Sequence, residues 1–331
     1  MKRALAEQDW KGALKYLFVN YNYVFSFILL LIVGRFASDQ FITVASISNL
    51  IRSSVFIGII ALGMTLTIIS GHIDLSVGSI LALAAALTVS VFNTTGSVLH
   101  ALIVAILAGG VLGLINGLFV GYARMASFIV TLATMTAYRS ITVQMGQGGP
   151  LLTDNEIYFD RLRWIGYGRL GGPQGLPYLV IIFVALTAFM WFVMNKTKFG
   201  RYVYAIGSNE RASKLTGIRV TVVKVQVFTI TGVLSGIAAF LYAARFGSVD
   251  VATAGRMFEL DVIAAVAIGG TMMSGGRGTV QGTFFGAVII YSIDAILSAY
   301  QVPAFVNDFI KGVLIIGAVL LQKVLDRTRE E

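Results

Sequence analysis

The chain alternates between long apolar stretches and short polar connections. An α-helix needs about 20 mainly apolar residues to cross about 30 Å of hydrocarbon, and inside lipid the backbone must satisfy its own hydrogen bonds. The pattern therefore predicts an all-α integral membrane protein with about ten transmembrane helices in a single domain, residues 1–331. These helices are expected at residues 16–34, 50–70, 75–92, 98–122, 127–145, 176–194, 221–245, 258–272, 279–300 and 306–324.

Composition supports a bilayer environment and excludes several kinds of chemistry. The 331 residues are 57% hydrophobic and 12% charged, whereas soluble domains carry about a quarter charged residues. The sequence has no cysteine, and its only histidines, His72 and His100, belong to no His-Glu-x-x-His motif. It also has no Walker A sequence. We therefore expect no enzyme, no metal site and no cofactor bound by this chain, and any ATP hydrolysis would belong to a partner.

The basic residues indicate the orientation of the chain. The net charge is +9, and in an alternating scheme that begins inside, most lysines and arginines fall on the cytoplasmic side, as the positive-inside rule requires. Their neighbour is then anionic lipid and not nucleic acid. We expect an inner-membrane protein with cytoplasmic termini, a cytoplasmic segment 1–15, a periplasmic connection at 146–175 and a cytoplasmic connection at 195–220.

Two glycine-rich breaks, 70–78 and 269–278, interrupt apolar runs in opposite halves of the chain. Paired breaks of this kind indicate a solute path between structural repeats. An aspartate at the bilayer centre costs about 2.5–3.5 kcal/mol, so Asp74 at that depth would need a partner or a watery path. Alternatively, this break is a tight cytoplasmic turn in which Asp74 caps the next helix. The candidate path residues, each of which could equally make a packing hydrogen bond, are His72, Asp74, Ser76, Asn116 and Thr271.

Two glycine ladders with a spacing of four residues predict flat helix faces. In lipid, where apolar attraction between helices is weak, small residues at this spacing let two backbones approach and gain van der Waals contact. A moving gate is the less favoured alternative. The ladders consist of Gly109, Gly113, Gly117 and Gly121, and of Gly278, Gly282 and Gly286.

Polar connections on the two sides of the membrane offer candidate contacts for other proteins. On the inner side, Asn209 is a good N-cap and Gly217 a good terminus for a helix of about two turns, which either docks in a partner or is a solvated loop. On the outer side, connection 146–175 could form a short interfacial helix. The outer charges either pair with one another or help to seat a partner by charge complementarity. They are Arg161, Arg163, Arg245, Arg256, Glu259 and Asp261.

Four blocks resemble, in order, the bacterial ABC importer permeases of the ribose and simple-sugar type. The blocks are 63–65 with 71–79, then 128–135, 197–217 and 259–278. The sequence departs from the common pattern at His72, Ser208, Met272 and Met273, near the breaks.

The resemblance implies a core of two identical or closely related permeases, two cytoplasmic ATPase domains that bind ATP and Mg²⁺, and an extracytoplasmic sugar-binding protein. Family substrates are pentoses, hexoses and polyols, with relatives for nucleosides and quorum signals. Residues that match the ATPase-coupling helix are Asn209, Glu210, Arg211, Ala212, Ser213, Lys214, Leu215, Thr216 and Gly217. An ion-coupled secondary transporter is the alternative from another class, and it would not need this helix.

Overall fold

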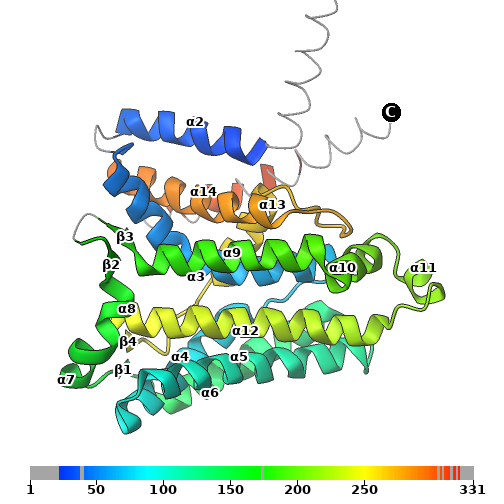
Figure 1. Cartoon of the computed structure of the whole chain (residues 1–331), viewed down its shortest axis with the longest axis horizontal. Helices are drawn as coiled ribbons and strands as arrows, with labels where there is room; N and C mark the ends of the chain where they lie inside the picture. The colour runs from blue at the N-terminus through cyan, green and yellow to red at the C-terminus, as the bar shows by residue number, and fades with distance from the viewer. Residues whose placement is uncertain are drawn as a thin grey trace, which may run out of the picture.

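The computed structural model describes residues 22–37, 41–172 and 175–303, together with 306–307, 309–313, 316–317 and 320. The predicted segment 1–15 lies outside these residues, and the predicted spans 16–34 and 306–324 lie only partly within them. The described part is mainly helical, with four strands of two residues each (Figure 1). The all-α membrane architecture expected from the apolar pattern is therefore confirmed.

Within the residues that the structure describes, nine helices match the expected positions. Six of them, α3, α4, α5, α9, α12 and α14, are long and apolar enough to cross a membrane. Of the others, α2 has only 16 residues, α13 has only 11 residues, and α6 carries too many polar side chains. The described residues therefore support six candidate spans and do not confirm ten. The bounds are α2 Asn22–Ala37, α3 Val44–Ile69, α4 Val77–Thr95, α5 Val98–Gly121, α6 Ser127–Met145, α9 Tyr178–Lys196, α12 Val220–Phe246, α13 Phe258–Ile268 and α14 Val280–Ala299.

The helices pack in layers with α12 near the centre. Helix α2 lies on α14, α14 lies on α3, and α3 lies on α12; on its other side α12 contacts α5 and α4, and α6 lies on α4 (Figure 1). Helices α3 and α12 are largely buried, whereas most residues of α5 and α9 are at least partly exposed. That division is typical of a bundle in which central helices meet protein and outer helices meet lipid.

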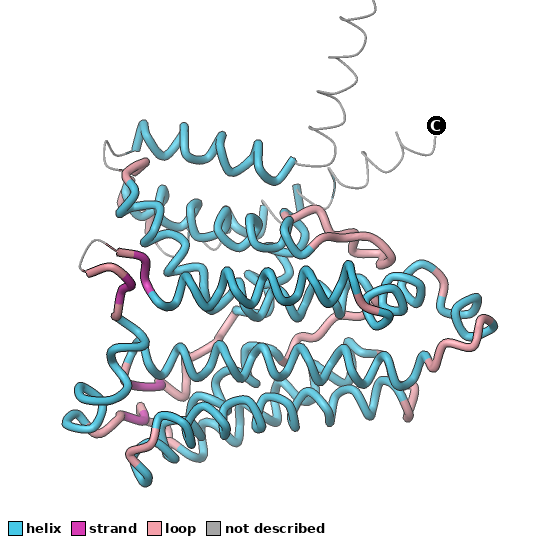
Figure 2. The backbone as a smooth tube through the Cα atoms, viewed as in Figure 1, coloured by secondary structure: helices cyan, strands magenta, loops and turns pink. Residues whose placement is uncertain are grey.

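The connections gather at two opposite ends of the bundle. Helices α10 (Lys198–Ser208) and α11 (Glu210–Leu215) lie at one end, which we call the α11 end (Figure 1). The short elements of 146–177 lie at the other, the β end, where β1 pairs antiparallel with β4 and β2 with β3 (Figure 2). They are β1 Leu151–Leu152, α7 Asn155–Ile157, the π-helical turn η1 Tyr158–Leu162, α8 Arg163–Tyr167, β2 Arg169–Leu170 and β3 Leu176–Pro177, joined by β4 Ser248–Val249.

The glycine ladder of α5 packs directly against α12. A Cβ on Gly109 would overlap the carbonyl oxygen of Gly232, and one on Gly113 would overlap that of Phe228. On α12, a Cβ on Gly236 would meet the backbone of Ala105 in the same way. The two backbones therefore touch along several turns, as expected for small-residue ridges in lipid.

This contact predicts that Gly109→Ala destabilises the bundle. The added methyl group must push two backbones apart, and overpacking of this kind costs about 1–3 kcal/mol. We expect a lower apparent melting temperature in detergent, measured by size-exclusion chromatography after heating. The matched control is Gly110→Ala on the next position, where a Cβ would meet only a side-chain methyl of Val233 at 3.2 Å. Equal melting temperatures for the two variants would contradict the packing role.

Candidate functional site

Helix α11 is a short, exposed helix at one end of the bundle. The side-chain oxygen of Asn209 accepts a hydrogen bond from the N–H of Ala212 at 2.9 Å, so Asn209 is the N-cap that the sequence predicted. Gly217 follows the helix with a φ of 85°, a left-handed conformation that glycine adopts without strain. Of residues 209–217 only Ser213 is buried, and Leu215 is 89% exposed. No other large apolar side chain in the described residues has a higher exposed fraction than Leu215.

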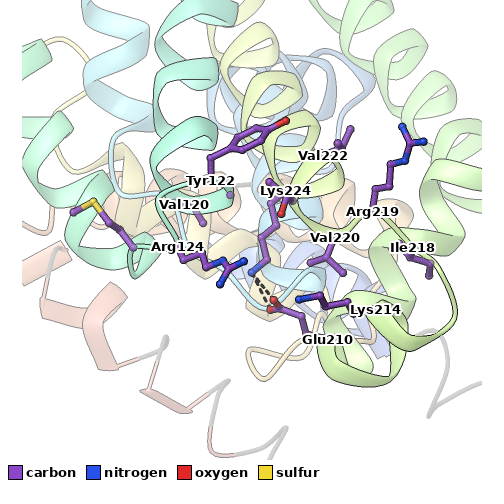
Figure 3. Close-up of a pocket in the computed structure, with 13 residues that line it drawn as sticks. Val120, Tyr122, Arg124, Glu210, Lys214, Ile218, Arg219, Val220, Val222 and Lys224 are labelled. Carbon is purple, nitrogen blue, oxygen red and sulfur yellow. Dashed lines mark hydrogen bonds and ion pairs between the residues drawn. The ribbon is translucent and has the colours of Figure 1, made fainter.

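One side of α11 faces a basic cavity of about 590 Å³ (Figure 3). The cavity lies between α11, the start of α12 and the connection that follows α5, and its charged lining residues are Arg124, Glu210, Lys214, Arg219 and Lys224. Glu210 is the only carboxylate among them, and it pairs with Lys224 of α12 at 2.9 Å. This ion pair ties the first residue of α11 to the central helix of the bundle.

The two glycine-rich breaks meet at the end of α10. The N–H of Gly276 donates a hydrogen bond to the carbonyl oxygen of Ile69 at 2.8 Å. A Cβ on Gly207, near the end of α10, would overlap that same carbonyl and would approach the Gly276 nitrogen to 2.6 Å. A Cβ on Gly275 would lie 3.2 Å from the backbone of Gly71. We call this three-way backbone contact the glycine junction; only Ser208 and Asn209 separate Gly207 from α11.

Three predicted path residues form one buried polar network. The hydroxyl of Ser76 donates to Asp74 at 2.6 Å, and the amide of Asn116 donates to Ser76 at 2.7 Å. The hydroxyl of Tyr138 donates to the carbonyl of Leu112 at 3.0 Å and lies 3.5 Å from the Asn116 oxygen. Asp74, Ser76 and Asn116 are completely buried, so in this conformation they contact protein and not an open path. The network links the first break to α5 and α6.

The other two predicted path residues lie elsewhere. His72, in the connection between α3 and α4, sits near the ring of Phe228. Burial, together with the nearby Lys224, lowers the pKa of His72 to about 4, and Glu210 partly opposes this shift. His72 is therefore neutral at physiological pH. Thr271 is buried in the second break, against Gly278.

Three of the predicted docking residues lie at the β end. Arg161 donates to the carbonyl of Gly96 at 2.8 Å, and both Arg161 and Arg163 are exposed. The guanidinium of Arg245 lies 3.9 Å from the ring centroid of Tyr167, and that of Arg163 lies 5.1 Å from the same ring. Cation–π contacts of this kind hold the arginines against α8.

The remaining three docking candidates lie deeper in the bundle. Asp261 pairs with Lys311 at 3.4 Å, and Lys311 also binds Asp294 at 3.1 Å. A Cβ on Gly78, at the start of α4, would lie 3.0 Å from the carboxylate of Glu259. Arg256 is exposed on the non-helical segment that precedes α13.

Sequence reasoning missed Arg139 of α6. Its guanidinium donates a hydrogen bond to the carbonyl of Ala254 at 2.5 Å and interacts electrostatically with Glu259 and Arg256. An arginine inside an otherwise uncharged predicted span was the signal that could have identified it, because charged residues within spans are rare and commonly functional.

Comparison with known proteins identifies the family. Residues 46–319 match the family model described as the permease component of the branched-chain amino acid transport system. The chain is 40% identical over 297 residues to the ribose import permease protein of Bacillus subtilis, covering 90% of each chain. It is 36% identical over 285 residues to the ribose import permease protein of Escherichia coli, covering 86% of this chain and 87% of the relative. No solved structure matches.

The chain belongs to this permease family. A third relative, the xylose transport system permease protein of Haemophilus influenzae, is 33% identical over 334 residues and covers 84% of this chain. The matched region contains α11, the glycine junction, the buried network and Arg139. All of these features therefore lie within the part of the chain that the family model describes.

The buried network predicts a stability cost for Asn116→Leu. Leucine removes the donor to Ser76 and leaves polar atoms unpaired in the interior, which costs about 1–3 kcal/mol. We expect a lower apparent melting temperature in detergent, measured by loss of monodisperse protein on heating. Ser90→Ala is the control, because that hydroxyl bonds only to Ala86 of its own helix. A wild-type melting temperature for Asn116→Leu would show that the network contributes nothing to stability.

Proposed function

We propose that this chain is the permease subunit of an ABC importer that carries a monosaccharide across the bacterial inner membrane. The support is membership of the permease family together with relatives that are ribose and xylose permeases over most of their length. A pentose is the favoured solute on this basis. The chain is a transport subunit and not an enzyme, and a separate ATPase subunit binds ATP and Mg²⁺ and hydrolyses the nucleotide.

The observation that carries the mechanism is the exposed, capped helix α11. We propose that 209–217 seats in a cleft of the cytoplasmic ATPase, with Leu215 as its apolar anchor. When the ATPase closes on ATP, α11 moves, and both the Glu210–Lys224 ion pair and the glycine junction carry that movement into the bundle. Allosteric coupling of this kind requires two global states with different partner contacts. The buried residues Asp74, Ser76 and Asn116 join the path, with His72 and Thr271, when the breaks rearrange.

The remaining partners follow from the two ends of the bundle. The binding protein docks at the β end, where Arg161, Arg163 and Arg245 gather. The other three docking candidates, Arg256, Glu259 and Asp261, lie deeper in the bundle, and we leave them out of this surface. A second permease, identical or closely related, packs beside the exposed side of α6, so that the solute path is enclosed between the two subunits. In this arrangement the α11 end and both termini are cytoplasmic, and connection 146–175 is periplasmic.

The proposed orientation predicts the labelling of single cysteines. The chain has no native cysteine, so Leu215→Cys and Arg163→Cys each introduce one reactive thiol at opposite ends of the bundle. With a membrane-impermeant maleimide, we expect Arg163→Cys to react in intact spheroplasts and Leu215→Cys to react only in inside-out vesicles. Reaction of Leu215→Cys from the outside would overturn both the orientation and the coupling role of α11.

The coupling role predicts that Leu215→Asp separates ATP hydrolysis from transport. A charged residue at a docking anchor costs about 2 kcal/mol or more, so stimulation of the ATPase by loaded binding protein and uptake of labelled D-ribose should both fall by about tenfold or more. Arg211→Ala should act in the same direction. Arg201→Ala, exposed on α10, is the control that should behave as wild type.

Unchanged stimulation and uptake in Leu215→Asp would remove α11 from the mechanism. Uptake that persists without ATP while the ion gradient is intact would instead favour an ion-coupled secondary transporter.

A further inference from the structure

Three charged residues lie on an open face of the bundle, midway between its two ends. Arg139 comes from α6, Arg256 from the non-helical segment 250–257, and Glu259 from the first turn of α13. Arg256 is exposed, and the other two are partly exposed. Electrostatic interaction of Arg139 with both of the others places the three in one cluster.

The segment 250–257 brings these residues into the bundle from the β end. It runs along α6, because Val251 lies beside Gly146 and the carbonyl of Ala254 accepts the hydrogen bond of Arg139. At its deepest point, Gly255 touches Gly78 so closely that a Cβ on either glycine would overlap the other's carbonyl oxygen. Two backbones in direct contact therefore fix the depth of the segment.

Helix geometry locates this contact. At about 1.5 Å per residue, Gly78 lies about 25 Å along α4 from Thr95, which is at the β end. In the other direction, α13 covers about 16 Å from the cluster to the second break, where Gly276 bonds to Ile69 near the α11 end. A bilayer core is about 30 Å thick. The cluster therefore lies at the depth of the hydrocarbon.

Lipid is an unfavourable neighbour for this face. Charged side chains at bilayer depth are costly and face other protein or water, and non-helical backbone is tolerated there only where protein covers it or water fills a cavity. One strip of the exposed side of α6 beside the cluster is small or polar, and it consists of Ala133, Thr136, Ala137, Ser140 and Gln144. By contrast, the exposed side of α5 presents Leu107, Val111 and Leu118. Outside its small or polar strip, α6 also exposes Ile129, Leu132 and Ile141.

We propose that α6 and segment 250–257 form a wall of the solute path, and that Arg139, Arg256 and Glu259 hydrogen-bond the hydroxyl groups of the sugar there. A guanidinium offers several donors in a planar fork, and a carboxylate offers two acceptor oxygens. Together these groups match the adjacent hydroxyls of a neutral polyol, because each hydroxyl can both donate and accept a hydrogen bond. This inference rests on the proposed function, since it assigns the residues that meet the transported sugar.

Solvent access to α6 tests the wall. In the assembled transporter, Thr136→Cys and Ser140→Cys are treated with a small charged methanethiosulfonate reagent, without nucleotide and after trapping with ATP and vanadate. We expect both to react in at least one state. Val111→Cys, also exposed but on the apolar side of α5, is the control that should stay unreactive. Thr136→Cys and Ser140→Cys thiols that never react, or that only form disulfides between two permease copies, would overturn the proposal.

Uptake tests the contact residues. Glu259→Gln removes the charge with little change of size, and Arg256→Gln replaces the guanidinium with a shorter, neutral amide. We expect uptake of labelled D-ribose to fall by about tenfold for each. Co-purification with the ATPase subunit checks that the complexes assemble. Arg201→Gln, on the exposed side of α10, should take up D-ribose at the wild-type rate. Wild-type uptake by both Glu259→Gln and Arg256→Gln would overturn the contact role.

The experiments distinguish failure of the proposed function from failure of the proposed sugar contacts. If wild-type transporter shows no ATP-dependent uptake of a monosaccharide, the proposed function fails whatever the cysteines do. If wild-type uptake is normal but Thr136→Cys and Ser140→Cys are inaccessible, the function stands and the path lies elsewhere.

Discussion

Direct contact between glycine backbones is the interaction on which this structure depends. At Gly78 and Gly255, at Gly207 and Ile69, and along the ladders of α5 and α12, a single methyl group would occupy the space of a carbonyl oxygen. Helices that approach this closely gain dispersion energy, which in lipid replaces much of the hydrophobic attraction available in water. The same contacts allow non-helical backbone to enter the bundle, because protein covers its polar groups.

The breaks are where this packing is joined to function. Helix α4 begins at the first break and α13 ends at the second, and both breaks reach the glycine junction at the end of α10. Packed backbone contacts have discrete arrangements and do not deform continuously. A displacement of α11 therefore has a short route to both breaks, because only two residues separate α11 from the glycine junction. The ion pair between Glu210 and Lys224 connects the same displacement to α12. This is the physical content of the coupling we propose.

Charges are distributed in a way that separates their roles. Arginines at the β end are exposed or stacked on Tyr167, and basic residues at the α11 end surround the cavity beside Glu210. The cluster of Arg139, Arg256 and Glu259 differs from both groups because it lies at bilayer depth on an open face. Burying such groups in lipid would cost far more than the pairing among them returns. Their position is reasonable only beside water or a polar partner.

The sequence by itself determined the membrane class, the positions of the long helices and the capped helix at 209–217. These follow from local patterns: apolar run length sets a span, and Asn209 and Gly217 set the ends of a short helix. The glycine ladder of α5 also indicated close packing correctly. However, the apolar pattern did not distinguish the six helices that are long and apolar enough to cross a membrane from α2, α6 and α13.

Only the tertiary structure decided what the breaks and charges contact. Asp74, Ser76 and Asn116 were singled out separately, but their single network requires α4 and α5 to be side by side. Glu259 and Asp261 are two residues apart and were placed together at an outer surface, yet Asp261 binds Lys311 and Glu259 lies against Gly78. Arg139 meets Ala254 across a long separation in the chain. Such contacts depend on which helices become neighbours, and residue patterns along one helix carry no information about that.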